Sequence, residues 1–110
     1  MQADRQSRSE SAIQSDILSY LRHLPQCWAV KYPATFMRGV PDIIGVFHGT
    51  FFALEVKRSG ERPTPIQDAV MEQIRTAGGI AEVVTNCEEA QSVMERIGVA
   101  YYARRLGCAP

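Results

Sequence analysis

Residues 39–60 have the sequence GVPDIIGVFHGTFFALEVKRSG. Two apolar runs of strand length flank a turn around Gly49, and this pattern predicts a β-hairpin. Asp42 opens the first run, while Glu55 and Lys57 lie within the second. Burying a charge is costly unless the charge is paired or bound to a metal. The hairpin therefore raises the question of what these charged side chains do in sequence that should build a core.

Further elements surround the hairpin on both sides. Apolar residues at helical spacing predict a first helix that ends at Pro25. A second helix is expected after Thr64, a favourable N-cap followed by proline, and Gly78 and Gly79 end it. The full set comprises helices over about residues 9–24, 64–79 and 86–98, and strands over about residues 27–34, 42–47, 51–57 and 80–85.

The predicted order is helix, three strands, helix, strand, helix (αβββαβα). Since the last strand follows a crossover helix, we expect it to pair parallel with a neighbour, next to the antiparallel hairpin. This predicts an α/β fold with a small mixed central sheet flanked by helices on both faces. The 110 residues suit a single domain with a core over about residues 9–97. Residues 98–110 fit no element and are expected to form a tail.

The tail combines aromatic and basic side chains, namely Tyr101, Tyr102, Arg104 and Arg105. Such residues can stack on bases or bind phosphates. They can equally pack in a dimer interface, and in a chain of 110 residues we favour the interface.

Composition excludes several classes of protein. No apolar run approaches the length of a membrane span, and the first residues lack the apolar stretch of a secretory signal. Three cysteines without a CxxC pair argue against a disulfide scaffold or a zinc ribbon, so a reducing, cytoplasmic location is expected. Twelve basic residues balance twelve acidic ones, so binding to nucleic acid would need a local basic patch.

The charged residues of the hairpin suit a metal site. Side chains alternate along a strand, so Glu55 and Lys57 share one face, and the turn brings Asp42 back toward Glu55. A divalent cation removes the repulsion between two close carboxylates, and Mg²⁺ commonly binds one or two carboxylates together with waters and substrate phosphates. A lysine alongside can orient the attacking water or stabilise charge on a phosphate. The set fits metal-assisted phosphodiester hydrolysis.

The alternative for these residues is purely structural. Glu55 and Lys57 could form an ion pair on the exposed face of an edge strand, where such pairs contribute little. Asp42 after Pro41 could be an ordinary turn residue. By itself the spacing of Glu55 and Lys57 favours this alternative.

Two polar residues of the first helix lie on its apolar side. At about 100° per residue, four apolar residues of the helix fall within about 60° of Glu10, and Gln14 lies in the same stripe. The four are Ile13, Ile17, Leu21 and Leu24. Both side chains should therefore point toward the sheet, as members of a polar site. As an alternative, Ser7 and Glu10 have the spacing of a capping box.

Gln67 also has two interpretations. Thr64 and Gln67 have the spacing of a capping box directly before an apolar run. Gln67 lies at the margin of the apolar face of its helix, which permits a role in the site. Spacing alone does not choose between the cap and the site.

Basic residues gather in the sequence around the hairpin, while several glutamates lie later. They could form a local patch for phosphates within a chain of zero net charge, or an ordinary solvated surface. The candidates for DNA binding are Lys31, Arg38, Arg58 and Arg62.

The motif Pro41-Asp42 followed by Glu55-Val56-Lys57 resembles the PD-(D/E)XK nuclease superfamily. With SESAIQSDILSYL before it and GGIAEVV after it, the chain resembles the virus-type replication-repair nuclease (VRR-NUC) domain over about residues 9–97. The resemblance implies a restriction-endonuclease-like fold. It also implies the stand-alone, bacterial or phage form of this module.

The resemblance further implies an endonuclease that depends on Mg²⁺ or Mn²⁺. Asp42, Glu55 and the carbonyl of Val56 would bind the metal, and Lys57 would be the catalytic lysine. Glu10 would be an acid for a second metal or a water-mediated contact, Gln67 a further catalytic residue, and Gln14 a supporting polar group. Neither a membrane nor a small-molecule cofactor is expected.

Stand-alone members of the family resemble Holliday-junction resolvases of DNA repair and recombination, and they are expected to act as homodimers. A twofold dimer suits symmetric cutting of two strands. Two alternatives stay open: a nuclease for flaps, nicked ends or RNA, and a non-catalytic DNA-binding module that retains the fold. Because Asp42, Glu55 and Lys57 are all present, we favour the enzyme.

Overall fold

The computed structural model describes residues 8–107. Every predicted element is present, and the elements follow one another in the predicted order. No helix in this part of the chain is long and apolar enough to cross a membrane. The alternative N-cap Ser7 lies outside the described residues. The elements are α2 (Glu10–Arg22), β1 (Cys27–Lys31), β2 (Ile43–Phe47), β3 (Thr50–Val56), α3 (Pro65–Thr76), β4 (Ile80–Val84) and α4 (Cys87–Arg105).

The strands form one mixed sheet in the order β1-β2-β3-β4. β2 pairs antiparallel with both β1 and β3, and β4 pairs parallel with β3. The hairpin and the parallel crossover strand are therefore confirmed. β3, which carries Glu55, is an interior strand because β2 and β4 flank it on either side.

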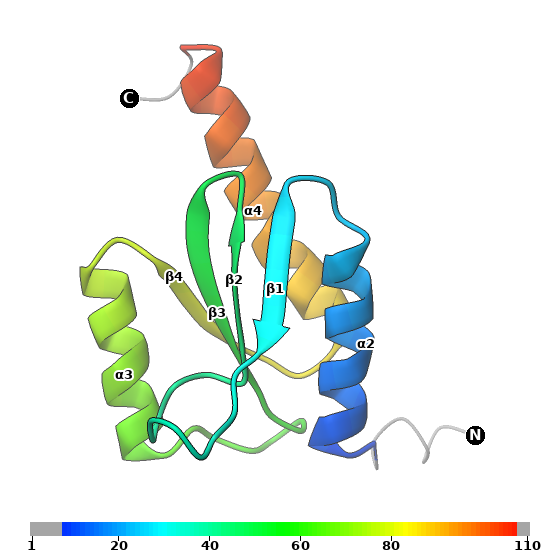
Figure 1. The fold of residues 1–110 in the computed structure, drawn as a ribbon, viewed down its shortest axis with the longest axis vertical. Helices are drawn as coiled ribbons and strands as arrows, with labels where there is room; N and C mark the ends of the chain where they lie inside the picture. The colour runs from blue at the N-terminus through cyan, green and yellow to red at the C-terminus, as the bar shows by residue number, and fades with distance from the viewer. Residues whose placement is uncertain (1–7, 108–110) are drawn as a thin grey trace.

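Helices cover the sheet on both faces, as predicted (Figure 1). Leu54 and Val56 of β3 pack in the larger core cluster, which includes apolar residues of α2 and α4. Ala53, on the opposite face of the same strand, packs in a smaller cluster with Met71 of α3 and Ala81 of β4. Glu55 lies two positions after Ala53 on the same strand, so its side chain is on the same face, the one that α3 covers.

One glycine inside β2 is required by close packing. A Cβ atom at Gly45 would collide with the carbonyl oxygen of Trp28 in β1 and with the ring of Phe52 in β3. Gly45 therefore lets the neighbouring strand and the large buried ring of Phe52 pack directly against the backbone of β2.

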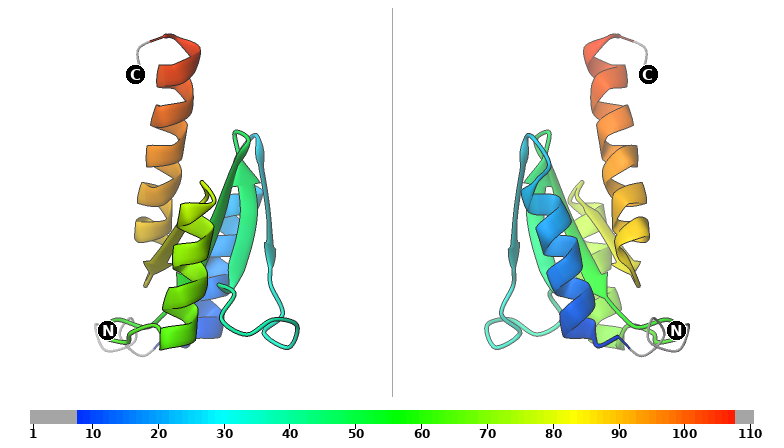
Figure 2. Two further views of the ribbon diagram at one scale, coloured as in Figure 1. Left: turned by 90° about the vertical axis from the view of Figure 1, so that its left-hand side faces the viewer. Right: turned by 90° about the vertical axis from the view of Figure 1, so that its right-hand side faces the viewer.

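The last helix is longer than predicted. α4 continues through Gly98 to Arg105, so most of the predicted tail is helical. A single glycine inside a helix costs only about 1 kcal/mol, and the ring of Tyr101 stacks on His48 of the β2–β3 turn at 4.3 Å. The prediction of a helix end at Gly98 was wrong because this tertiary contact supports the last turns. Cys108 lies beyond the described residues. The end of α4 extends past the sheet (Figure 2).

Candidate active site

Residues far apart in the sequence meet at one end of the molecule. The beginnings of α2 and α3, the end of β3 and the connection from β1 to β2 all lie at that end (Figure 1). The β2–β3 turn and the end of α4 lie at the opposite end (Figure 1). Because Tyr101 stacks on His48 of that turn, the aromatic group of α4 is separated from Glu55 by the length of β3.

Asp42 lies against the end of β3. The backbone N–H of Val56 donates a hydrogen bond of 2.8 Å to Oδ2 of Asp42. The antiparallel register pairs Ile43 with Leu54, and its continuation places Asp42 opposite Glu55. The carboxyl groups of these two residues also form a side-chain hydrogen bond. The pairing of Asp42 with Glu55 that the hairpin predicts is thus present.

Glu55 is a buried acid with an unsatisfied oxygen. Its side chain is 2% exposed, and Oε1 has no hydrogen-bond partner among the described residues. Burial, followed by the charge and a side-chain hydrogen bond of Asp42, raises the pKa of Glu55 to about 8. An acid held in this way favours either a proton or a cation beside it.

Lys57 is the neighbouring positive charge. Its Nζ lies 3.7 Å from Oε2 of Glu55, and its side chain is 13% exposed. This charge lowers the pKa of Glu55, but less than burial and Asp42 raise it. The interpretation as an ion pair on an exposed edge strand is therefore wrong, because β3 is an interior strand and both side chains are largely buried.

The register of β2 and β3 leaves the carbonyl of Val56 without an N–H opposite it on the β2 side. Continuing the register of β2 and β3 places Pro41 opposite Val56. Proline has no N–H to donate, and the N–H of Val56 itself binds the carboxylate of Asp42. The same Pro-Asp pair therefore brings Asp42 to the site and leaves a carbonyl oxygen available as a ligand.

Glu10 lies near the same end through the first turn of α2. Its pKa is raised, first by burial, then by a hydrogen bond and charge repulsion from Glu61, with a smaller contribution from Asp42. Ser9 caps the helix, accepting a hydrogen bond of 3.1 Å from the N–H of Ala12. The capping box with Glu10 is therefore not needed to explain the start of α2.

Glu61 is the residue of this region that sequence reasoning missed. Its Oε1 accepts a hydrogen bond of 2.8 Å from the N–H of Arg58, and its carboxyl contacts that of Glu10. The sequence gives one signal, a single acid within the otherwise basic loop RSGERP at residues 58–63. Spacing could not show that this loop closes on α2.

Gln14 points inward, as the helical wheel predicts. Its side chain is buried and its Oε1 has no partner among the described residues. It lines a pocket of about 370 Å³ together with Lys31 of β1. The structure thus places Gln14 beside a predicted DNA-binding residue.

Gln67 forms the capping box of α3. Its Oε1 accepts a hydrogen bond of 2.8 Å from the N–H of Thr64, and its own N–H donates to Oγ1 of Thr64 at 3.3 Å. The cap interpretation is confirmed. The further role in the site stays a prediction.

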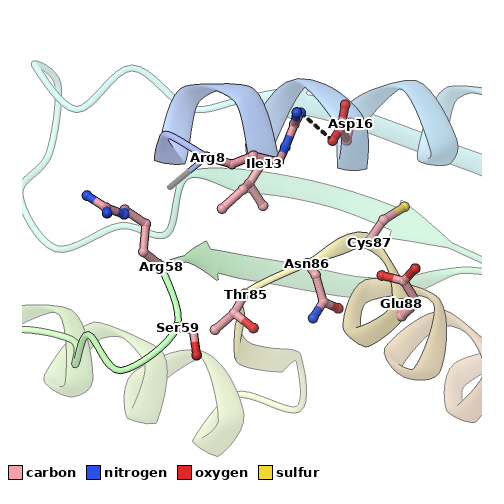
Figure 3. A pocket seen from close by; sticks show the side chains of 9 residues that line it. All are labelled: Arg8, Ile13, Asp16, Arg58, Ser59, Thr85, Asn86, Cys87 and Glu88. Atoms are coloured by element: carbon pink, nitrogen blue, oxygen red, sulfur yellow. Dashed lines mark hydrogen bonds and ion pairs between the residues drawn. The ribbon is translucent and has the colours of Figure 1, made fainter. Parts of the chain in front are cut away.

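The four basic candidates are exposed, and they come from the ends and connections of strands. Arg38 lies in the β1–β2 connection, while Arg58 and Arg62 lie in the β3–α3 connection. Arg58 also lines a pocket of about 540 Å³ between the start of α2 and the start of α4 (Figure 3). Within this pocket Arg8 pairs with Asp16 at 2.6 Å, so Arg58 is the basic residue that remains available for a phosphate.

The residues present fit a magnesium or manganese ion. Asp42, Glu55 and the Val56 carbonyl supply hard oxygen atoms, and Oε1 of Glu55 is buried without a partner in the described part of the chain. Within residues 8–107 no three His, Cys, Asp or Glu side chains are grouped so as to hold a metal. Two carboxylates are nevertheless a usual number for Mg²⁺, because waters and phosphates complete its shell.

The fold and the site together define a mixed α/β domain with a buried carboxylate pair and a lysine at one end of its sheet. Two solved structures share this fold, and both are described as VRR_NUC domains. One matches with a TM-score of 0.67 at 23% identity, covering 78% of this chain and 94% of that chain. The other matches with a TM-score of 0.67 at 18% identity, covering 80% of this chain and 86% of that chain. The restriction-endonuclease-like fold is therefore confirmed.

No protein-family model matches the chain, and no curated protein matches it significantly. The likeness is thus one of fold. The chemistry of the domain has to be inferred from its own residues.

Proposed function

We propose that the protein is a divalent-metal-dependent endodeoxyribonuclease that acts on branched DNA. One observation carries the proposal. The carboxyl of Glu55 is 2% exposed, and one of its oxygens has no hydrogen-bond partner within residues 8–107. Asp42 lies against it, and the Lys57 ammonium is 3.7 Å away. The VRR_NUC fold of two solved structures supports a nuclease. A soluble, cytoplasmic location remains part of the proposal.

The residues have distinct roles in this mechanism. Held by Asp42, Glu55 and the Val56 carbonyl, Mg²⁺ or Mn²⁺ would stabilise charge on the phosphate and supply a water of lowered pKa. Lys57 orients that water or stabilises the phosphate charge. Glu10 acts from the start of α2 through a water. Gln67 is a further catalytic residue that acts through its side-chain amide. Gln14 is a supporting polar group of the site.

DNA binding rests on the exposed basic residues at the site end. Lys31, Arg38, Arg58 and Arg62 would neutralise phosphates and position the strand. Contacts to phosphates do not depend on the base sequence, so these residues suit recognition of DNA shape rather than of bases.

We include a homodimer in the proposal, because paired cuts in a branched substrate need two sites related by a twofold axis. An uncovered apolar stripe supports it. Trp28, Val46 and Phe51 are cross-strand neighbours, all three are exposed, and they lie on the part of the sheet face that α3 leaves open. This stripe is a second candidate interface besides the end of α4.

Cleavage of synthetic DNA tests the activity. We expect wild-type protein to cut a four-way junction only with Mg²⁺ or Mn²⁺, and linear duplex far less. Flap, nicked and RNA substrates in parallel test the alternative nucleases. Asp42→Asn should abolish cutting, while Asp68→Asn, the same change at an exposed position of α3, should not.

Three outcomes would contradict parts of the proposal. If the protein binds DNA but cuts no substrate with either metal, it is a non-catalytic DNA-binding module. Equal cutting of linear and branched DNA would remove the preference for branches. Wild-type cutting by Asp42→Asn would remove the site assignment.

A further inference from the structure

The connection between β1 and β2 is a loop whose base is held by backbone contacts next to the carboxylate pair. The N–H of Tyr32 donates a hydrogen bond of 2.8 Å to the carbonyl of Asp42, which closes the base of the loop. On the far side of the loop, Gly39 has a φ of 86° and packs so closely on α3 that a Cβ would meet the carbonyl oxygen of Ile66 at 2.8 Å. Both ends of the loop are therefore fixed to the scaffold.

The tip of this loop is apolar and exposed. Phe36 is 78% exposed and Met37 is 54% exposed, and Arg38 follows them in the chain. The N–H of Phe36 donates to the carbonyl of Pro33 at 3.2 Å, so a turn holds the tip. Figure 2 shows the connection standing out from the body at the end where α2 and α3 begin. The ring of Phe36 meets the ring of Tyr32 edge-on at 6.2 Å, and most of its surface, like that of Met37, remains open to a partner.

The surroundings of the tip favour DNA as that partner. The loop ends at Asp42, so its base adjoins the carboxylate pair. Arg38 adjoins the tip and Lys31 lies at the start of the loop, and both are exposed. Apolar side chains such as Phe and Met insert between base steps in proteins that distort DNA, with basic residues on the adjacent phosphates. An aromatic ring can also stack on any unpaired base.

We propose that Phe36 and Met37 form a wedge that enters the base stack of the bound DNA, with Arg38 on a neighbouring phosphate. The inference rests on the proposed nuclease function and deepens it. Opening a base step costs least where bases are already unpaired or poorly stacked. The wedge thus gives a physical reason for a preference for branched over linear DNA, independent of the cleavage chemistry.

Fluorescence of a base analogue tests the wedge without cleavage. A four-way junction carries 2-aminopurine beside the branch point, with EDTA present, and its fluorescence rises when the base unstacks. We expect wild-type protein to raise the signal and Phe36→Ala to lose most of the rise, with binding weakened about tenfold. Phe36→Trp should retain both. Val99→Ala, a truncation of another exposed apolar residue (70%) on α4, is the matched control and should behave as wild type.

The outcomes separate this inference from the nuclease proposal. If wild type binds and cuts junctions while Phe36→Ala unstacks and binds them equally well, the wedge is wrong and the nuclease stands. If Phe36→Ala instead changes only the oligomeric mass, the tip is a protein contact and the wedge is again wrong. If wild type neither binds nor cuts any DNA, both proposals fail. Circular dichroism and thermal unfolding should match wild type, since the side chain of Phe36 is exposed.

Discussion

At the scale of the residue, Glu55 is a carboxyl group whose ionisation opposes folding in the absence of metal. Its pKa of about 8 in the folded protein exceeds its ordinary value of 4.5. Between these two values the folded state keeps a proton that the unfolded state releases. Stability therefore falls as the pH rises through this window, and the full penalty is present above about pH 8.

Glu55→Gln should remove this penalty. We expect the variant to gain stability relative to wild type as the pH rises, by on the order of 2–4 kcal/mol between about pH 5 and about pH 9. Urea unfolding in EDTA at several pH values measures the difference. A difference that does not change with pH would show that Glu55 ionises normally. The same variant should lose metal-dependent cutting.

Gln67 has an observed role in the capping box of α3 and a proposed role in the site, and substitutions can separate the two. Thr64→Ala removes the capping hydroxyl and should cost about 1 kcal/mol of stability while leaving cutting intact. Gln67→Glu keeps the acceptor oxygen of the capping box, so its stability should stay near wild type. Its cutting should fall at least about tenfold, because the role proposed for Gln67 in the site uses a neutral amide and the variant places a further negative charge there. Thermal unfolding and junction cleavage measure the two effects, and undiminished cutting by Gln67→Glu would leave Gln67 as a cap alone.

At the scale of the element, the end of α4 packs on the β2–β3 turn through the rings of Tyr101 and Tyr102. Tyr101 stacks on His48 at 4.3 Å with planes 13° apart, and the guanidinium of Arg105 lies 5.5 Å from the same ring. These contacts lie at the end of the sheet opposite the carboxylate pair (Figure 1). The element that the sequence left as a tail therefore contributes to stability rather than to the site.

Tyr101→Ala should lower the stability by about 1–2 kcal/mol, since the stacked rings lose their contact. Cutting per folded molecule should not change. Urea unfolding and junction cleavage provide the two measurements, with Val99→Ala on the same helix as the control. A loss of cutting without a loss of stability would assign the aromatic group to DNA.

At the scale of the whole molecule, one half of a sheet face is apolar and open, and the proposed homodimer would cover it. Trp28 is 60% exposed on the edge strand β1, next to Val46 and Phe51 across the strands. α3 packs against β4 at the other side of this face, so no part of residues 8–107 covers the stripe. A second copy related by a twofold axis would bury the stripe of both chains at once.

Trp28→Glu should therefore convert a dimer into a monomer, because it places a charge in the centre of this interface. Tyr102→Glu makes the same kind of change at the end of α4 and should leave the dimer intact. Light scattering or sedimentation gives the mass of each variant. A monomeric Tyr102→Glu beside a dimeric Trp28→Glu would move the interface to α4, and a monomeric wild type at high concentration would exclude the homodimer.

The sequence alone determined the order of the elements and the pairing of Asp42 with Glu55. Both depend on local pattern: the period of the apolar residues, and a short turn that forces two neighbouring strands into register. The inward direction of Gln14 followed from helical periodicity in the same way.

Only the tertiary structure decided how charged this end of the molecule is. The contact of Glu61 with Glu10 joins a loop to a helix far away in the chain, and the near-complete burial of Glu55 depends on how the sheet packs with α3 and the loops around it. No local pattern encodes these distances. The pKa of a carboxyl follows from the burial and the charges around it, so the property that points to a metal at Glu55 appears only once the chain has folded.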